Sequence, residues 1–583
     1  MDIRMVHPRP QFCRERWISL DGEWDFSFDF SNSGKERNWC EAVGFEGKIR
    51  IPFAPESKLS GVGYTDFIEH LWYHRKLVIP GEWQSGRQRL HFGGVDYRCE
   101  IYLDGIQVGS HTGLDSFWVD IEAEPGSEHD LVVWVEDLIR SHQQPFGKQS
   151  PRLISAKCNY TRTTGIHQTV FLEELPESFL ESSHIIPDFD GGKLIFIPEL
   201  RNQIGRMKLT VIVSGNGKKE QRTAAVAVSG VPVTVELENP EAWSPENPFL
   251  YDVTFELTDA DGRIVDRVFS YAGLRKFHIE KERFYLNNRP IYLRLVLDQG
   301  FYPEGIWTAP DDKALKHDIE LALAAGFNGA RLHEKIFSER FHYWADKLGY
   351  LTWAEFPDWG IGFWHHFTPV HQDFNGAFRD YYAQWSAVVK RDRNHPSIIS
   401  WTPFNETCSI QDLDEHRRII RDIAALTRTL DPTRPVNDTS GYVHEDTDIW
   451  TVHTYMQDPE KLAEALAAEP VYKSFPERDR GYCGQPLVPD EYGGVRFVPE
   501  AYRKDSAANA WGYSTSEDAR SAEKKIAELT GVVLQNERCA GYCYTQLTDI
   551  EQEQNGIYNY DRTAKFDMET IRSIFGKKPS WSC

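Results

Sequence analysis

After about residue 275 the sequence alternates short apolar runs with amphipathic segments, and this alternation restricts the fold more than any other feature. In the segment after the first run, Leu315, Ile319 and Leu323 share one helical face that Gly326 can close. The runs, eight in number, occupy residues 291–297, 328–332, 350–356, 398–406, 436–438, 449–455, 487–491 and 539–547. Eight strand–helix units predict a (β/α)₈ TIM barrel over residues 275–583.

Two all-β regions precede the predicted barrel. Short strand-like runs separated by turn pairs such as Asp104-Gly105 extend to about residue 178 and predict a jelly-roll β-sandwich over residues 1–178. Residues 179–274 continue as strands and have the size of an immunoglobulin-like β-sandwich. We therefore expect a multidomain protein with the order jelly roll, immunoglobulin-like sandwich, TIM barrel.

The charge and the hydropathy pattern exclude several classes of partner. The formal net charge is −23, without a run of basic residues, which disfavours nucleic acid and anionic lipid. The first residues lack the apolar core of a signal peptide, and no run reaches the roughly 18 apolar residues that span a bilayer. We expect a cytoplasmic protein that is not associated with a membrane, and the oligomeric state, homo-oligomers included, stays open.

Carboxylates end two of the predicted strands. The fourth run ends in Asn405-Glu406 and the seventh in Asp490-Glu491. TIM-barrel active sites lie at the C-terminal ends of the strands, and glycoside hydrolysis needs one carboxylic acid and one carboxylate. Strands four and seven face each other across a barrel, so the sequence predicts a glycosidase. Either Asp490 or Glu491 could be the second group, because neighbouring strand residues point to opposite sides.

Other polar and aromatic groups at the predicted strand ends are candidates for binding sugar. Each lone histidine or tyrosine among them is equally compatible with a hydrogen-bonded packing residue. The aromatic content of 13% suits a protein that stacks sugar rings. The adjacent His365 and His366 point apart on an extended chain, so we expect no metal site there. The substrate-binding candidates are Asp298, His333, Trp359, Asn405, His453, Tyr455 and Gln546.

Several motifs carry a resemblance to a known family. Together with the domain order and the two strand-end glutamates, they resemble glycoside hydrolase family 2, which contains β-galactosidases, β-glucuronidases and β-mannosidases. The resemblance extends over essentially the whole chain in a three-domain form. The motifs lie at residues 20–24, 102–105, 160–166, 243–251 and 393–399.

The resemblance implies roles for individual residues. Glu406 matches the general acid/base of the family, Glu491 its nucleophile and Asn405 the amide that binds the 2-hydroxyl of the sugar. Arg162, on a loop of the jelly roll, is expected to contact the sugar from outside the barrel. The family retains anomeric configuration through a covalent glycosyl-enzyme. No cofactor is implied.

Departures from the family patterns bear on the substrate. β-Glucuronidases of the family carry an Asn-x-Lys motif after strand eight that binds the sugar carboxylate, whereas residues 554–556 here are Gln-Asn-Gly. We therefore expect a small-molecule or oligosaccharide β-galactoside as substrate. The alternatives are β-glucuronide or galacturonide, α-L-arabinopyranoside, β-galactofuranoside and β-mannoside.

Two further expectations concern metal and catalysis. The Glu-x-His motif with which long β-galactosidases bind magnesium is replaced by Glu355-Phe356-Pro357, so no metal is expected. A catalytically silent carbohydrate-binding protein is the alternative from another class. The presence of both Glu406 and Glu491 favours the enzyme.

Overall fold

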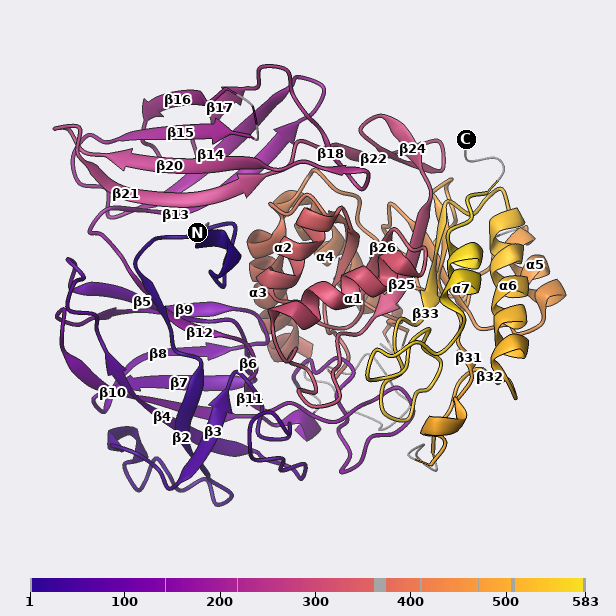
Figure 1. The fold of residues 1–583 in the computed structure, drawn as a ribbon, viewed down its shortest axis with the longest axis horizontal. Helices are drawn as coiled ribbons and strands as arrows, with labels where there is room; N and C mark the ends of the chain where they lie inside the picture. Colours follow the sequence, from indigo (N-terminus) through magenta and orange to yellow (C-terminus); the bar gives the residue numbers. More distant parts are fainter. Residues whose placement is uncertain are drawn as a thin grey trace.

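The structure of the protein, a computed structural model, describes residues 3–141, 143–215, 217, 219–360, 374–408, 412–469, 471–504 and 509–579. The His365-His366 pair lies outside the described residues. No helix in the described part of the chain is long and apolar enough to cross a membrane. The chain folds into two β-sandwiches and a TIM barrel (Figure 1).

The barrel sheet is parallel and buried, which explains why its strands read as continuous apolar runs. Every residue of these strands except Arg294 is buried. The strands, in spatial order, are β28 (Ile398–Thr402), β27 (Leu351–Glu355), β26 (Gly329–Leu332), β25 (Leu293–Asp298), β33 (Gly541–Thr545), β30 (Leu487–Gly493) and β29 (Trp450–Thr454).

The predicted fifth strand, 436–438, is not a regular strand. Val436 and Ser440 instead form single parallel bridges with Trp401 and Asn405, next to β28. The carboxylate of Asp438 accepts hydrogen bonds from nearby backbone amides, including that of Glu445 at 2.7 Å. Such local side-chain bonds compete with ladder pairing, so the sequence prediction was wrong about the extent of this strand.

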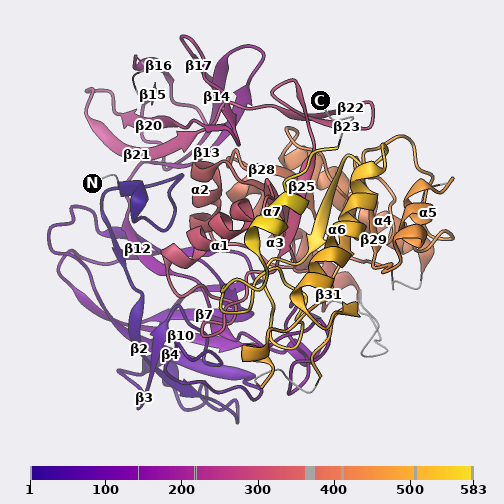
Figure 2. The ribbon, with the colours of Figure 1, turned by 45° about the vertical axis from the view of Figure 1, so that its right-hand side comes forward.

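Helices cover the outside of the barrel (Figure 2). Six of the helices begin at a Ser or Asp whose side chain accepts a backbone amide of the first turn, which satisfies donors that the helix itself leaves unpaired. After the first helix Gly326 has φ +101°, as its predicted role at the end of that helix requires. The helices are α1 (Asp312–Ala324), α2 (Glu339–Leu348), α3 (Phe374–Asp392), α4 (Leu413–Leu430), α5 (Pro459–Ala467), α6 (Ala519–Gln535) and α7 (Met568–Phe575).

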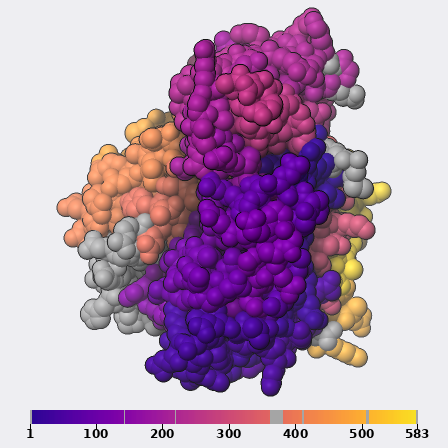
Figure 3. Space-filling model, turned by 90° about the vertical axis from the view of Figure 1, so that its left-hand side faces the viewer, coloured from indigo at the N-terminus to yellow at the C-terminus, as the bar shows by residue number. Residues whose placement is uncertain are grey.

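The jelly roll packs a six-stranded sheet, in the order β3-β2-β4-β10-β7-β8, against a four-stranded sheet, in the order β1-β12-β5-β9. Its strands are β1 (Trp17–Ser19), β2 (Gly22–Phe28), β3 (Gly47–Ile51), β4 (His70–Val78), β5 (Arg87–Phe92), β6 (Val95–Asp96), β7 (Arg98–Leu103), β8 (Ile106–Thr112), β9 (Phe117–Glu122), β10 (Glu128–Glu136), β11 (Gly165–Ile166) and β12 (Val170–Glu174). Figure 3 shows this domain, indigo to purple, below the magenta sandwich.

The immunoglobulin-like sandwich pairs the sheet β13-β14-β17 with the sheet β16-β15-β20-β21, and smaller strands lead into the barrel or lie beside it. The sandwich strands are β13 (Phe179–Asp188), β14 (Lys193–Arg201), β15 (Lys208–Ser214), β16 (Gln221–Val226), β17 (Val233–Glu236), β20 (Tyr251–Thr258) and β21 (Ile264–Ala272). The smaller strands are β18 (Trp243–Ser244), β19 (Asn247–Pro248), β22 (Phe277–Glu280), β23 (Arg283–Leu286), β24 (Arg289–Ile291), β31 (Val495–Arg496) and β32 (Ser514–Thr515).

The loop between β10 and β11 lies against the barrel mouth, at the ends of the strands. The amide of Phe146 donates to the carbonyl of Trp359 at 2.6 Å, and the hydroxyl of Tyr160 donates to Glu553 Oε2 at 2.7 Å. Gly147 has φ +59°, and a Cβ at this position would lie 2.4 Å from the carbonyl oxygen of Glu334. Only glycine allows this approach, so the jelly roll supplies a wall of the barrel mouth.

A buried carboxylate fixes the sandwich to the entrance of β28. Asp346, in α2, accepts hydrogen bonds from the hydroxyl of Tyr271 at 2.7 Å, His395 Nδ1 at 2.6 Å and the amide of Ser397 at 2.9 Å. Its backbone carbonyl accepts Trp243 Nε1 at 2.8 Å. One side chain thus connects a sandwich strand, a barrel helix and the turn that precedes the strand leading to Asn405-Glu406.

Replacement of Asp346 by alanine should lower the free energy of unfolding by about 3 kcal/mol, because buried donors lose their acceptor. Urea denaturation followed by tryptophan fluorescence measures the change. Glu122→Ala, which removes a carboxylate that is 86% exposed, is the matched control and should leave the midpoint unchanged. Equal midpoints for the two variants would contradict the anchoring role of Asp346.

Candidate active site

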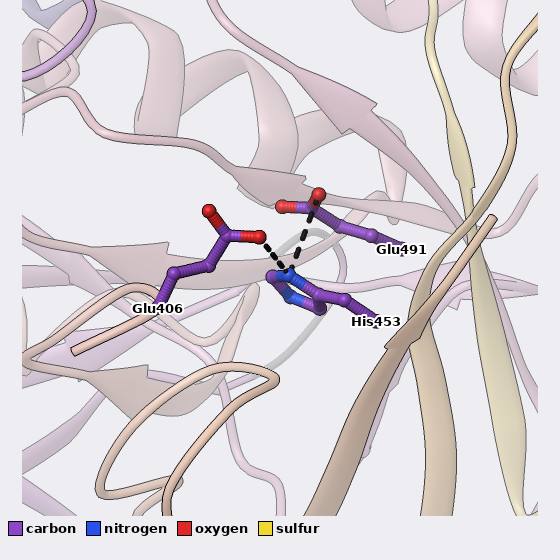
Figure 4. A group of neighbouring side chains, drawn as sticks. All are labelled: Glu406, His453 and Glu491. Atoms are coloured by element: carbon purple, nitrogen blue, oxygen red, sulfur yellow. Dashed lines mark hydrogen bonds and ion pairs between the residues drawn. The ribbon is translucent and has the colours of Figure 1, made fainter. Parts of the chain in front are cut away.

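Glu406 and Glu491 meet at the barrel mouth, with His453 between them (Figure 4). One carboxylate oxygen of each glutamate and one ring nitrogen of His453 all lie within 4.8 Å of one another. All three side chains are buried. Glu406 follows β28, His453 lies in β29 and Glu491 in β30, so three strands build the group.

A β-bulge decides which carboxylate of the Asp490-Glu491 pair joins Glu406. In the pairing of β29 with β30, Val452 is opposite Pro489 but His453 is opposite Glu491, so Asp490 is the extra residue. A bulge re-aims the side chains that follow it. Asp490 Oδ2 accepts the hydroxyl of Ser440 at 2.5 Å, whereas Glu491 lies beside Glu406. The sequence left open whether Asp490 or Glu491 lies beside Glu406, and the structure places Glu491 there.

Glu491 is held as an anion by its neighbours. Arg331 Nη1 donates to Oε1 at 2.9 Å, and the hydroxyl of Tyr455 donates to Oε2 at 2.6 Å. Burial by itself would raise the pKa of Glu491, but the charges of His453 and Arg331 outweigh it and hold this pKa well below its usual range. A buried carboxylate that is kept ionised can serve as a nucleophile.

His453 bridges the two glutamates. Its Nδ1 lies 2.6 Å from Glu406 Oε1 and 3.5 Å from Glu491 Oε2, and its Nε2 lies 2.9 Å from the hydroxyl of Ser440. Burial lowers the pKa of His453, but Glu491, Asp490 and Glu406 raise it more, so the net shift is upward. The neighbouring carboxylates therefore favour the imidazolium form of His453.

Arg331 is the site residue that the sequence analysis missed. Its guanidinium is fully buried and donates to Glu355 at 2.6 Å, to Glu491 at 2.9 Å and to Asn405 Oδ1 at 2.8 Å. An arginine inside an apolar strand is costly unless its charge is paired, and that was the available signal. His333 joins the same network, because its Nδ1 lies 2.8 Å from Glu355 Oε1.

The amide of Asn405 is oriented by this network. Since Oδ1 accepts from Arg331, the Nδ2 donors point elsewhere, and Nδ2 is buried with no acceptor among the described residues. The backbone amide of Asn405 is fixed by Asp358 Oδ1 at 2.8 Å, and its carbonyl accepts Trp359 Nε1 at 3.3 Å. A buried amide donor without a partner suits a ligand hydroxyl or carbonyl.

The remaining predicted substrate-binding residues differ in whether they contact the two glutamates. Tyr455 contacts Glu491 directly, while Gln546 is bonded to Gln299 and Asn555 at 2.7 and 2.8 Å. Asp298 accepts the amide of Gly300 at 2.9 Å, and burial raises its pKa to about 6. No bond joins Asp298 or Gln546 to either glutamate in the described chain. Their substrate contacts stay predictions.

Arg162 is not brought to the two glutamates. Its guanidinium donates to the carbonyls of Ser150, Arg152 and Thr65 and lies 4.2 Å from the ring of Phe67, all in the jelly roll. These bonds hold the jelly-roll loop together. The expected contact between Arg162 and a sugar has no support in its surroundings and stays a prediction.

The geometry of Glu406, His453 and Glu491 is compatible with metal ligation by distance alone. His453 Nδ1, however, is already hydrogen-bonded to Glu406, and Arg331 donates to Glu491 at 2.9 Å. A cation beside this guanidinium would be repelled. We therefore interpret the cluster as two carboxylates that share a histidine.

A large cleft lies elsewhere in the described structure. Its volume is about 1230 Å³, and it runs between the N-terminal segment, the jelly roll and the barrel helices, with Trp17, Trp307 and Arg340 in its walls. Neither Glu406 nor Glu491 lines it. The chemistry of the side chains, rather than cleft size, identifies the candidate active site.

Comparison with known proteins places the chain among glycoside hydrolases. The family model described as "Glycosyl hydrolases family 2, TIM barrel domain" matches residues 277–500, and the model "Glycosyl hydrolases family 2" matches residues 195–275. A β-glucuronidase of Paenibacillus borealis is 25% identical over 520 residues, covering 84% of this chain and 85% of that protein. The β-glucuronidase of Canis lupus familiaris is 24% identical, with 74% and 69% covered.

A solved structure shares the fold. The β-glucuronidase from Ruminococcus gnavus in complex with D-glucuronic acid superposes with a TM-score of 0.79 at 19% identity, covering 97% of this chain and 99% of that chain. At this identity the likeness concerns the fold. The three-domain architecture is therefore shared with that chain over nearly its full length.

Replacement of His453 by glutamine should shift the acidic limb of the kcat/KM profile to higher pH. Glutamine keeps a hydrogen-bond donor for Glu406 but removes the charge that helps to lower the pKa of Glu491, so a higher pH is needed to ionise Glu491. A charged hydrogen bond contributes ~1.5–3 kcal/mol, so kcat/KM falls roughly 10- to 100-fold at neutral pH. An unshifted acidic limb would show that His453 does not set this pKa.

Proposed function

The chain belongs to glycosyl hydrolase family 2, and from this premise we propose that it is a retaining, exo-acting β-glycosidase whose glycone is a uronic acid, with β-glucuronide as the first candidate. The observation that carries the mechanistic part is the separation of the two carboxyl groups. Oxygens of Glu406 and Glu491 lie within 4.8 Å. Retaining enzymes keep their carboxyl groups about 5 Å apart, whereas inverting enzymes leave roughly 6.5–9.5 Å for a water molecule.

The proposed reaction has two displacements. In the first, a carboxylate oxygen of Glu491 attacks the anomeric carbon, the bond to the aglycone oxygen breaks, and Glu406 transfers its proton to that oxygen. In the second, Glu406 takes a proton from water, the water oxygen attacks the anomeric carbon, and the ester bond to Glu491 breaks. The product is the free sugar with its original anomeric configuration.

The surroundings of each carboxylate support these assignments. Glu491 is the more strongly stabilised anion, with Arg331 at 2.9 Å and Tyr455 at 2.6 Å, which suits a nucleophile. Glu406 has no arginine among its hydrogen-bond partners in the described structure and is bonded to His453 at 2.6 Å. The two carboxylates therefore have different partners, as two different roles in the reaction require. Asn405 Nδ2 is available to the 2-hydroxyl of the sugar.

The names of the relatives bear on the glycone. The sequence pattern alone favoured a β-galactoside, because the Asn-x-Lys motif for a sugar carboxylate is missing. The two relatives and the solved structure described above are named β-glucuronidases, which supports the uronide alternative instead. The catalytically silent binding protein is disfavoured, since a protein that only binds sugar has no need for a carboxylate pair at this separation.

Azide rescue tests the roles of the two glutamates. On an activated aryl glycoside, Glu491→Ala should lose at least about 1,000-fold in kcat, and azide should restore turnover with a glycosyl azide of inverted configuration. Glu406→Ala should give the azide of retained configuration, because azide then attacks the glycosyl-enzyme. Proton NMR of the anomeric signal reads both products, and Glu477→Ala, at an exposed position, is the control.

A panel of p-nitrophenyl glycosides tests the glycone. We expect the highest kcat/KM on the β-D-glucuronide, with β-D-galacturonide next, and lower values on β-D-galactoside, β-D-mannoside and α-L-arabinopyranoside. A preference for the β-D-galactoside over both uronides would overturn the uronide proposal and leave the retaining mechanism in place. The same azide product from both glutamate variants would overturn the mechanism instead.

A further inference from the structure

We infer that Lys148, carried by the jelly-roll loop into the barrel mouth, binds the carboxylate of the uronic-acid glycone in place of the missing Asn-x-Lys lysine. The inference rests on the proposed function and names the side chain that binds the negatively charged carboxylate of the substrate. It assigns the specificity-determining cation to a different domain from the one that holds the catalytic glutamates.

Lys148 is a buried cation without a counter-ion. The residue is 5% exposed, and its Nζ lies 3.3 Å from the centre of the Trp359 ring. No hydrogen bond or ion pair joins Nζ to another residue in the described part of the chain. Buried charges are normally paired, because an ammonium that has lost water and gained no acceptor is costly. The missing acceptor points to a ligand.

The ammonium group lies in the electrostatic field of the catalytic pair. Burial alone would lower the pKa of Lys148. The charges of its neighbours raise this pKa by more than burial lowers it, so the side chain stays protonated; these neighbours are Cys158, Glu334, Glu406 and Glu491. In return Lys148 helps to lower the pKa of Glu491. The ring below the ammonium, Trp359, also donates its indole N–H to the carbonyl of Asn405 at 3.3 Å. Lys148 is therefore a neighbour of the group that Asn405, Glu406 and Glu491 form.

The backbone around Lys148 is fixed in place. The amides of Phe146 and Gly147 donate to the carbonyl of Trp359 at 2.6 and 3.3 Å, and the carbonyl of Lys148 accepts the amide of Tyr160 at 2.7 Å. Gly147 packs so closely on Glu334 that a Cβ would lie 2.4 Å from its carbonyl oxygen. A lysine on a pre-positioned backbone loses little entropy when it binds a ligand, which favours specific recognition.

The other buried cations near the barrel mouth are already engaged. Arg331 is bonded to Glu355, Glu491 and Asn405. Lys335 donates to the carbonyls of Gly300 and Trp307. Lys565 donates to Asp549 Oδ1 at 2.6 Å and to the carbonyls of Gln554 and Gly556. Of these cations in the described structure, Lys148 is the one whose N–H groups are not already hydrogen-bonded within the protein.

The loop after β33, where the motif lysine would lie, offers no substitute. Asn555 Oδ1 accepts from Gln546 Nε2 at 2.8 Å, and Asn555 Nδ2 donates to Glu553 Oε1 at 3.0 Å. Both ends of this amide are therefore used within the protein. A uronate that entered the mouth would find its cationic partner on the jelly-roll side. The strength of such a pair comes from the low dielectric of a buried site.

A matched pair of substrates isolates the carboxylate. p-Nitrophenyl β-D-glucuronide and p-nitrophenyl β-D-glucoside differ at C5 in a carboxylate against a hydroxymethyl group. We expect Lys148→Met to lower kcat/KM for the glucuronide by about 100- to 1,000-fold and for the glucoside by less than about 10-fold. Lys148→Arg, which keeps the charge, should recover part of the preference for the glucuronide. Lys157→Met, at an exposed lysine of the same loop, is the control.

The ratio of the two kcat/KM values is the decisive readout, because it does not depend on how much of a variant is folded. Binding of methyl β-D-glucuronide to Glu491→Gln, with and without Lys148→Met, measured by calorimetry, should show the same loss without turnover. Equal losses on both substrates, or an unchanged ratio, would overturn the role of Lys148 while the wild-type glucuronidase activity stands. A wild-type enzyme that hydrolyses neutral glycosides but no uronide would overturn the proposed glycone, and the role of Lys148 with it.

Discussion

The buried guanidinium of Arg331 is the interaction on which the candidate active site depends. It rises from β26 into the barrel and donates to groups on three other strands or strand ends: Glu355 of β27, Asn405 after β28 and Glu491 of β30. Breaking a buried charge pair costs ~3–5 kcal/mol, so these groups hold one another in a single arrangement. The orientation of the Asn405 amide and the ionised state of Glu491 are both consequences. Strands that are remote in sequence act as one site because one cation connects them.

A second constraint is the contact between the jelly roll and the barrel mouth. Gly147 lies so close to the barrel backbone that no side chain fits, and the bond from Tyr160 to Glu553 fixes the other side of the loop. The hydrogen bonds of Asp346 fix the immunoglobulin-like sandwich to the turn that precedes β28. Both sandwiches therefore contribute to the structure around the candidate active site. One completes the opening in which substrate would lie, and the other supports the strand that carries Asn405 and Glu406.

Most of the fold could be predicted because its elements are encoded locally. Seven of the eight predicted barrel strands form where continuous apolar runs occur, and six of the helices begin at Ser or Asp caps. The exception is the region of Val436, where Asp438 binds its own neighbouring amides instead of extending the ladder. Arg162 shows the other limit: a motif places it on the correct loop, but its three carbonyl partners are visible only in three dimensions.

The sequence by itself determined the fold class, the family resemblance and the two glutamates at the C-terminal ends of two strands, because periodicity and strand-end chemistry are local properties. Tertiary structure decided between Asp490 and Glu491, since the bulge against β29 sets the direction of both side chains. It also revealed Arg331 and Lys148. The importance of each lies in its partners, or in the lack of one, and an electrostatic environment is built from residues far apart in the chain.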